Sequence, residues 1–429
     1  MRPNKLVQKQ KASLTMRKFC IKTLGCKVNQ YESQVIRERF IKDGCMEVES
    51  LDDADIFVVN TCTVTSNSDT KSLRLLRKAM KKDKCVVVTG CMVEDRELDL
   101  SKLSGARFII KNKDKYKIPE IIDKGEKKAS RESFKISAFK GHTRVFVKIQ
   151  DGCNNVCSFC KVRIVRGRAK SRPFKDILGE CLTLIKNGTK EIVLTGICLG
   201  SYGKDLLERM NLSGLIQEIC KIEGDWRLRL SSIEPKDIDK TLIQQLLTEP
   251  RLCKHLHIPF QAGDTYILKK MDRPYRQEDY LNIVSKLRDV ISDIAITTDI
   301  MVGFPGEKEA NFHNTVDFLN IVRPMRMHVF PYSGRKGTKA YSYRDGVSNV
   351  VKKRREDKLL FLAKEFSSEF KEKFLDKEID VLVEDKRTKD SYLQGYTDRY
   401  IKVLIDGPEK LKGKIIKLKN TVVEGPLKA

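Results

Sequence analysis

The chain has 429 residues, 40% of them hydrophobic, so it is long enough for more than one domain with an ordinary core. Lysine and arginine number 84 against 58 aspartates and glutamates, and this net charge of +26 favours a polyanionic partner, nucleic acid before membrane. No apolar run approaches the roughly 18 residues of a membrane span, and the basic N-terminus lacks the apolar segment of a secretory signal. We therefore expect a cytoplasmic protein whose 13 cysteines serve metal or redox chemistry rather than disulfides.

Residues 17–125 alternate strand and helix patterns, and this alternation predicts an open parallel α/β sheet. The strand patterns are apolar throughout, which fits burial on both faces of such a sheet. We expect strands near 19–24, 55–60 and 85–90, with helices over 31–42 and 66–82.

A cysteine follows each of these three strands, and we name the set the strand-end cysteines: Cys26, Cys62 and Cys91. Ligands of open α/β sheets bind outside the carboxyl ends of the strands, so the three thiols are expected to converge. We interpret them as three ligands of a metal cluster that needs a fourth ligand to complete its coordination. The alternative is a coincidence of buried cysteines, because free cysteine is a common core residue. Three others fall within or before strands and are interpreted as structural: Cys20, Cys45 and Cys85.

Residues 126–150 begin with a polar stretch and are interpreted as a linker into a second βα repeat. Six further strand patterns, separated by helix patterns, predict a partial (β/α)6 barrel, whose chemistry should lie at the carboxyl ends of its strands. We expect these strands at 144–150, 191–195, 226–231, 255–259, 294–302 and 325–330.

The loop after the first barrel strand carries three cysteines at the spacing C-x3-C-x2-C, which we name the loop cysteines: Cys153, Cys157 and Cys160. Thiolates suit zinc, copper or iron–sulfur clusters, and a structural zinc site is usually closed by four ligands. No fourth ligand stands nearby, since the nearest histidine is His142 and the next cysteine is Cys181. The spacing resembles the signature of radical S-adenosylmethionine (SAM) enzymes, and this resemblance implies a 4Fe–4S cluster whose free iron is chelated by SAM. A three-ligand zinc site or chance spacing is the alternative.

Polar groups and glycines follow other barrel strands. Glu234 and Gln261 stand at strand ends, where they can hold a ribose or an amino group, or serve only as loop residues. The turn from Gly303 to Gly306 lets the backbone approach a ligand closely. Lys161–Lys175 holds seven lysines and arginines and no acidic residue, and we interpret it as a phosphate-binding lip rather than a solvated face.

Beyond the barrel, residues 352–374 have a charged helix pattern, and short strand patterns follow it. Lysines, tyrosines and glycines between these strands suggest a small β-barrel that binds RNA backbone, with a purely structural module as the alternative. We therefore expect three domains, over residues 17–125, 139–370 and 372–429.

In this order, the features resemble the methylthiotransferase family from about residue 17 onward. Two N-terminal phrases are similar to the branch that acts on threonylcarbamoyladenosine in tRNA: Thr23–Ser33 and Asn60–Thr65. Further phrases resemble the family's barrel motifs: Leu194–Gly196, Ser231–Pro235, His257–Gly263 and Thr298–Glu307. The tail phrase Gly395–Tyr400 resembles the TRAM module, an RNA-binding barrel.

The resemblance implies an enzyme that replaces the C2 hydrogen of threonylcarbamoyladenosine, next to the anticodon at position 37, with a methylthio group. It implies two 4Fe–4S clusters: one on the loop cysteines that cleaves SAM, and an auxiliary one on the strand-end cysteines that carries the sulfur. No side chain is implied as catalytic acid or base, since the clusters and SAM carry the chemistry. Glu234, Gln261, Gly303 and Gly306 become candidates for SAM contacts.

The resemblance also implies the partners of the protein. These are the anticodon stem-loop of tRNA, SAM and an electron donor, with neither membrane nor DNA among them. Basic residues near Arg163–Arg172 and the C-terminal module are expected to hold the tRNA phosphates.

Two departures from the family pattern border the expected active site. Lys161, Val162 and Arg163 stand where an isoleucine pair and a proline are frequent, and Cys198 stands where histidine or asparagine is commoner. One alternative function keeps the fold and changes the substrate to isopentenyladenosine in tRNA or to a ribosomal-protein aspartate. The phrase Lys27–Ser33 argues against both substrates. A second alternative is a non-catalytic RNA-binding protein with structural zinc.

Overall fold

The computed structural model describes residues 16–82, 84–124, 135–207, 210–422 and 426–428. The chain divides into two compact units, which we name the N-terminal unit (residues 1–63 and 67–134) and the C-terminal unit (residues 64–66 and 135–429). The start of the expected linker, up to residue 134, lies outside the described residues. The expected regions 139–370 and 372–429 both fall in the C-terminal unit.

The N-terminal unit is a five-stranded sheet in the order β2-β1-β3-β4-β5, and every neighbouring pair is parallel. Its strands are β1 (Lys18–Thr23), β2 (Met46–Glu47), β3 (Ile56–Thr61), β4 (Cys85–Gly90) and β5 (Phe108–Ile109). The helices are α1 (Lys27–Lys42), α2 (Ser66–Met80) and α3 (Ile118–Lys124). The predicted parallel α/β sheet is confirmed, although α1 begins four residues before the predicted Tyr31.

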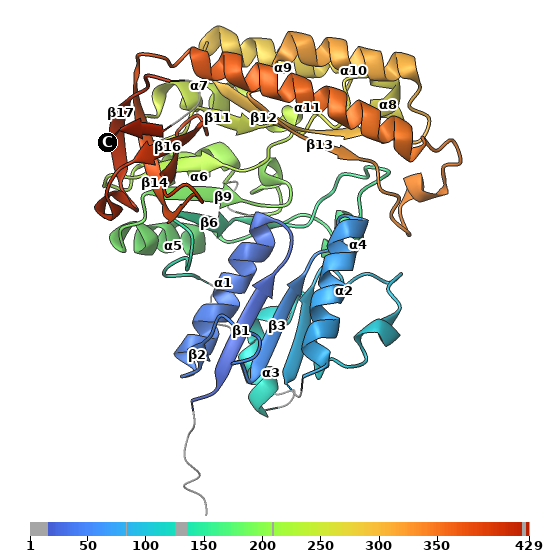
Figure 1. Cartoon of the computed structure of the whole chain (residues 1–429), viewed down its shortest axis with the longest axis vertical. Helices are drawn as coiled ribbons and strands as arrows, with labels where there is room; N and C mark the ends of the chain where they lie inside the picture. The colour runs from blue at the N-terminus through green and yellow to red at the C-terminus, as the bar shows by residue number, and fades with distance from the viewer. Residues whose placement is uncertain (1–15, 83, 125–134, 208–209, 423–425, 429) are drawn as a thin grey trace, which may run out of the picture. The chain divides into compact units, whose positions relative to one another are not determined.

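Helices cover both faces of this sheet (Figure 1). On one face, Ile36 and Phe40 of α1 pack in one core cluster with residues of α3. On the other face, Leu76 and Ala79 of α2 pack against alternate residues of β3 and β4. Because both faces are covered, the strands are buried, as the apolar runs in the sequence require.

The C-terminal unit begins with two three-stranded parallel sheets, in the orders β10-β9-β6 and β11-β12-β13. Isolated bridges between Leu228 and Leu252 and between Ser232 and His257 join β10 to the β11 side. The result is a six-stranded partial barrel, which confirms the prediction. Its strands are β6 (Arg144–Lys148), β9 (Glu191–Thr195), β10 (Arg227–Leu230), β11 (His255–His257), β12 (Ala295–Val302) and β13 (Arg326–Pro331).

The connections between barrel strands carry the helices expected of a βα repeat. The helices are α5 (Phe174–Lys186), α6 (Leu212–Cys220), α7 (Lys240–Thr248), α8 (Thr265–Lys270), α9 (Gln277–Val290) and α10 (Glu309–Val322), and the last strand leads to α11 (Asn349–Glu372). A small pair of strands, β7 (Gln150–Asp151) and β8 (Lys170–Ser171), flanks the cysteine loop and the short helix α4 (Val162–Arg166). No described helix is both long enough and apolar enough to span a membrane.

The chain ends in a curled five-stranded sheet in the order β17-β14-β15-β16-β18. Its strands are β14 (Glu378–Arg387), β15 (Leu393–Thr397), β16 (Lys402–Asp406), β17 (Ile415–Lys419) and β18 (Pro426–Lys428). All its pairs are antiparallel except β16 with β18, and β17 and β18 occupy the two edges. The predicted small β module is therefore present as a curled half-barrel.

A buried ion cluster fixes this C-terminal sheet to the barrel. The carboxylate of Glu191 accepts from Arg227 (2.7 Å) and from Arg229 (2.7 and 3.1 Å), and it is fully buried. The same guanidinium groups donate to backbone carbonyls at the end of β15 and in the turn that follows it: Arg227 to Tyr396, and Arg229 to Thr397 and Asp398. Burial opposes the charge of Glu191, yet the two arginines hold the pKa of its carboxyl well below its usual range.

Candidate functional site

The strand-end cysteines lie at the carboxyl edge of the N-terminal sheet. The register pairs Thr23 of β1 with Asn60 of β3, and Thr61 of β3 with Gly90 of β4, so the three cysteine loops leave neighbouring strands. The backbone N–H of Cys91 donates to Thr61 O at 3.1 Å. The side chain of Cys26 is exposed, whereas those of Cys62 and Cys91 are buried.

Two glycines allow these loops to approach one another. Gly25 has φ +98°, and a Cβ there would lie 2.9 Å from Sγ of Cys62. Gly90 has φ +100°, and a Cβ there would lie 2.4 Å from the carbonyl oxygen of Thr61. Each glycine immediately precedes a strand-end cysteine, so a side chain at either position would displace the thiol that follows it.

A buried amide network ties the same loops together. The Asn29 side chain donates to Leu24 O at 2.7 Å and to Thr61 O at 2.9 Å. The Asn60 side chain donates in turn to Asn29 O (2.9 Å) and to Ser33 Oγ (3.0 Å). Residues Asn29 and Ser33 belong to the phrase that resembles one substrate branch of the family, and here they brace the ends of β1 and β3.

The cysteines interpreted as structural have different surroundings. Cys20 and Cys45 are buried and Cys85 is half-buried. Burial raises the pKa of all three thiols, so they are protonated at neutral pH. A buried protonated thiol behaves as a small hydrophobic group, which suits the structural interpretation.

The loop cysteines follow β7 and are held in a tight turn. Gly152 has φ +65°, and a Cβ there would meet the carbonyl oxygen of Arg168 at 2.0 Å. The N–H of Cys153 donates to Gly167 O at 3.1 Å, and that of Cys160 donates to Cys157 O at 3.1 Å. All three thiols are partly buried and close enough to affect one another's charge. Burial raises the pKa of Cys160 to about 11, so its thiol becomes an anion only where a cation or metal compensates.

Within the described ranges, no three histidine, cysteine or acidic side chains surround the position of a single metal ion. The loop cysteines and the strand-end cysteines are nevertheless each suited to an iron–sulfur cluster. Each consists of three thiols, the ligands that soft metal centres prefer.

Cys198, one of the two departures from the family pattern, lies directly beside the loop cysteines. Its thiol is hydrogen-bonded to that of Cys153, and Ser201 Oγ donates to Cys198 Sγ at 3.1 Å. The N–H of Cys198 donates to Gln150 Oε1 at 2.8 Å. The departure therefore places an extra sulfur next to a proposed cluster ligand.

Glu234, a candidate SAM contact, is bound by an arginine that sequence reasoning missed. Arg273 donates to both carboxylate oxygens of Glu234, at 3.0 and 2.7 Å, and to Pro259 O and Tyr280 Oη. Its Nη1 also lies 3.8 Å from Cys157 Sγ. Burial works against its charge, but these neighbours raise the pKa of Arg273 overall, so it stays cationic beside the loop cysteines.

The other candidates for SAM contacts differ from one another. Gln261 has φ +69°, and within the described part of the chain its buried Oε1 has no hydrogen-bond partner, so a ligand could engage it. The N–H groups of the two glycines already have acceptors: Gly303 donates to Glu307 Oε2 at 2.6 Å, and Gly306 donates to Asp345 O at 2.7 Å.

A second polar group that the sequence did not reveal lies on β11, β12 and β13. Asp299 accepts from His257 Nε2 and from His328 Nδ1, each at 3.1 Å, and His257 Nδ1 also contacts Thr297 Oγ1 at 2.9 Å. Burial opposes the charge of Asp299, but these histidine hydrogen bonds hold its pKa well below the usual range. Only the strand register brings these residues together, so no local spacing in the sequence could have indicated them.

The basic segment after the loop cysteines divides into two kinds of residue. Arg166 and Arg172 form ion pairs with Asp151 (3.1 Å) and Glu180 (2.8 Å) and so stabilise the fold. The remaining arginines and two lysines have exposed side chains: Arg163, Arg168, Lys170 and Lys175. These four residues are the ones available to a polyanion.

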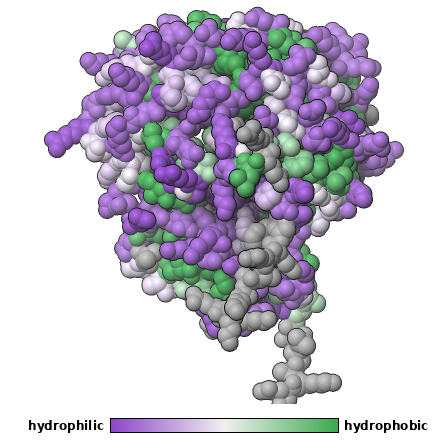
Figure 2. Space-filling view, turned by 180° about the vertical axis from the view of Figure 1, so that it is seen from behind, coloured by the Kyte–Doolittle hydropathy of each residue, from purple (hydrophilic) through white to green (hydrophobic). Residues whose placement is uncertain are grey.

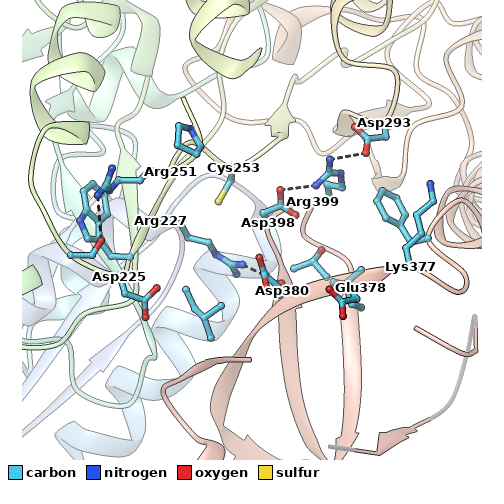
Figure 3. A pocket seen from close by; sticks show the side chains of 17 residues that line it. Asp225, Arg227, Arg251, Cys253, Asp293, Lys377, Glu378, Asp380, Asp398 and Arg399 are labelled. Atoms are coloured by element: carbon cyan, nitrogen blue, oxygen red, sulfur yellow. Dashed lines mark hydrogen bonds and ion pairs between the residues drawn. The ribbon is translucent and has the colours of Figure 1, made fainter. Parts of the chain in front are cut away.

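A cavity of about 600 Å³ lies between the barrel and the C-terminal sheet (Figure 3). Its lining includes Arg227, Cys253 and Asp293, which stand at or before the amino-terminal ends of β10, β11 and β12. Arg399 crosses it to bind Asp293 at 2.6 Å and Asp398 at 2.7 Å. The cavity is at the end of the barrel opposite the loop cysteines, and the chemistry of such barrels lies at the carboxyl ends.

Two family models match the chain. Residues 18–110 match a family described as Uncharacterized protein family UPF0004, and residues 147–319 match the Radical SAM superfamily. Among solved structures, the radical SAM methyltransferase TsrM from Kitasatospora setae is similar with a TM-score of 0.55 at 14% identity, over 76% of this chain and 77% of TsrM. That likeness concerns the fold alone.

Curated relatives match over almost the whole chain. The threonylcarbamoyladenosine tRNA methylthiotransferase MtaB of Bacillus subtilis is 35% identical, over 92% of both chains. The tRNA-2-methylthio-N(6)-dimethylallyladenosine synthase of Acetivibrio thermocellus is 37% identical, over 94% of this chain and 88% of its own. Enzymes of this kind use SAM and carry two 4Fe–4S clusters, and the two sets of three thiols suit that requirement. The chain therefore belongs to the radical SAM methylthiotransferase family.

Proposed function

We propose that this enzyme attaches a methylthio group to C2 of N6-threonylcarbamoyladenosine at position 37 of tRNA. The observation that carries the proposal is the presence of two separate sets of three cysteines, each at the carboxyl ends of parallel strands. One set suits the cleavage of SAM, and the other suits a sulfur-carrying centre. A single set would support only one of these tasks.

The loop cysteines would hold the cluster that binds SAM, and the strand-end cysteines would hold the auxiliary cluster. When bound, the two clusters supply the electron that cleaves SAM and the sulfur that is transferred to the substrate. Arg273 would fix the carboxylate of Glu234 and place a positive charge beside Cys157. Gln261 Oε1 would accept a hydrogen bond from SAM, since it is buried with no partner in the described residues.

The choice of threonylcarbamoyladenosine rests on the resemblance of the N-terminal phrases and on the similarity to the Bacillus subtilis enzyme named for that nucleoside. The relative named for dimethylallyladenosine is equally similar, so that nucleoside is the second candidate substrate. In this chain, Asn29 and Ser33 of the phrase are engaged in bracing the strand ends. The phrase therefore supports the substrate through family resemblance alone.

The partners of the enzyme follow from its charge and its chemistry. A net charge of +26 favours a polyanion, and the four exposed cations of the basic segment offer phosphate contacts beside the loop cysteines. We place the enzyme in the cytoplasm with tRNA, SAM and an electron donor as its partners, and with neither membrane nor DNA.

Mass spectrometry of nucleosides from tRNA tests the proposal. A strain that lacks this gene should lose 2-methylthio-N6-threonylcarbamoyladenosine, and restoring the gene should return it. If that nucleoside persists while its isopentenyl analogue disappears, the chemistry stands and the substrate is wrong. If both persist in the deletion strain, a tRNA substrate is contradicted and a ribosomal-protein aspartate becomes the candidate.

Iron and sulfide analysis of anaerobically prepared protein tests the cofactor assignment separately. Two 4Fe–4S clusters require about eight iron atoms per chain. Four iron atoms per chain would contradict the assignment of an auxiliary cluster to the strand-end cysteines. Zinc in place of iron would favour the alternative of a non-catalytic RNA-binding protein.

A further inference from the structure

Helix α2 of the N-terminal unit carries a stripe of positive charge that the proposed chemistry does not use. We name it the α2 stripe, and it consists of Lys71, Arg74, Arg77 and Lys78 of the helix and of Lys81, which directly follows the last helical residue, Met80. All five side chains are exposed. The intervals of three and four residues place them along one face of the helix. The opposite face carries Leu76 and Ala79 and packs on the sheet.

The charges of the α2 stripe are not balanced within the described residues. None of the five side chains takes part in an ion pair with a described acidic group. The helix itself contains a single acidic residue, Asp69, near its beginning. Neighbouring cations of like charge repel one another, so the arrangement costs stability unless an anion binds there.

The stripe is also the wall of a groove. A hollow of about 680 Å³ is lined by all five cations together with Leu75 and Leu24. From Lys71 to Lys78 the helix rises about 10.5 Å, and cations three or four residues apart are separated along its axis by about 4.5 to 6 Å. A nucleic-acid strand carries one phosphate per about 3.4 Å of its axis, so these cations are spaced more widely than the phosphates but on the same scale.

The groove lies beside the strand-end cysteines. Leu24 lines the groove and directly precedes Gly25, where a Cβ would lie 2.7 Å from Cβ of Cys62. The N–H of Leu24 donates to Asn60 O at 2.9 Å, which fixes the groove wall to the end of β3. A ligand in the groove would therefore lie next to the loop that carries Cys26.

We propose that the α2 stripe binds the sugar–phosphate backbone of the RNA substrate and so holds it beside the strand-end cysteines. The inference rests on the proposed function, because it takes the substrate to be an RNA. The groove lining combines five cations with only two apolar side chains, Leu24 and Leu75, and so suits a ligand that carries several negative charges in a row. The contact carries no sequence information, so it would position the RNA rather than select it.

The test compares RNA binding by the full-length holoenzyme and by a charge-reversed variant, Lys71→Glu/Arg74→Glu/Lys78→Glu. Fluorescence anisotropy with a labelled anticodon stem-loop should show binding weakened roughly tenfold or more in the variant, because three phosphate contacts become repulsive. The slope of log affinity against log salt should be shallower by about 2, from about 0.7 per lost contact. SAM cleavage without RNA should equal that of the wild type.

A matched control distinguishes the effect of the α2 stripe on RNA affinity from the effect of the net charge of the protein. Lys186→Glu/Lys240→Glu/Lys286→Glu makes the same change in charge at exposed lysines of the C-terminal unit, none of them paired with a described acidic residue. It should retain most of the affinity. A neutral variant, Lys71→Gln/Arg74→Gln/Lys78→Gln, should show the shallower slope with a smaller loss, even if charge reversal disturbs folding.

Three outcomes would overturn the inference. One is equal affinity and equal slope in the stripe variant and the wild type, and another is an equal loss in the matched control. The third is unchanged RNA binding with slower reduction by an acidic electron carrier, which would assign the stripe to a protein partner. If the wild type itself binds no RNA, the proposed function fails first, and that result is distinct from the other three.

Discussion

The loop cysteines come from one short loop, whereas the strand-end cysteines come from three strands separated by some thirty residues each along the chain. The loop cysteines depend on a local turn that Gly152 allows. The strand-end cysteines depend on the register of a whole sheet and on the amide network around Asn29. The two sites should therefore respond differently to mutation: the first to changes in its ligands, and the second also to changes in its scaffold.

The largest effect is expected from Cys157→Ala. Loss of a loop cysteine should abolish both the cleavage of SAM and the formation of methylthiolated product, because both need the cluster that binds SAM. The measurement is deoxyadenosine and methionine released under reducing conditions, together with nucleoside analysis. Normal SAM cleavage by this variant would contradict the assignment of the loop cysteines.

Cys62→Ala should separate the two sites. It should still cleave SAM with a reductant, but it should form no methylthio product, and its iron content should fall by about half. Normal product from this variant would refute the cluster at the strand ends. Loss of SAM cleavage as well would show that the two sites are not independent.

Asn29→Ala tests the scaffold of the strand-end cysteines without removing a ligand. It deletes the donor to two carbonyls, Leu24 O and Thr61 O, and should destabilise the N-terminal unit by about 1 to 3 kcal/mol. We expect product formation to fall several-fold while SAM cleavage is retained. Denaturant unfolding measures the stability, and an unchanged midpoint with normal product would contradict the bracing role.

The smallest effect is expected from Cys45→Ala, which serves as the control for the set. Cys45 is buried and its thiol is protonated, so its loss removes one small apolar contact, at about 1 kcal/mol. SAM cleavage, product and iron content should equal those of the wild type. An inactive but folded variant would overturn its structural interpretation.

The sequence alone predicted the parallel sheet, the partial barrel and the C-terminal β module, because apolar runs and their spacing are local features. The start of α1 was placed too late, because Asn29 is a buried polar residue and interrupts the apolar pattern of the helix. The last module was predicted as a small β-barrel, and the structure shows a curled half-barrel that is consistent with this prediction.

The candidate site was predictable only in part, because only those of its features that are local in the sequence could be recognised. The cysteines could be found because a short spacing and a repeated position at strand ends are visible along the chain. Arg273 could not be found, since its partner Glu234 stands 39 residues away and nothing local joins them. The group around Asp299 depends on the register of three strands, which a single sequence does not specify.

The buried ion cluster around Glu191 has a consequence for how this protein can be divided or recombined. A cut near residue 371 would seem natural from sequence, yet it would remove the carbonyls that Arg227 and Arg229 bind. Leaving a buried donor without its acceptor costs about 1 to 3 kcal/mol, so the loss of several such carbonyls is a large share of a domain's stability. The C-terminal sheet therefore cannot be replaced by an unrelated module without a loss of stability. A chimaera with a different C-terminal sheet would need backbone carbonyls at the same positions to accept from Arg227 and Arg229. We therefore expect the barrel and this sheet to be exchanged together rather than separately.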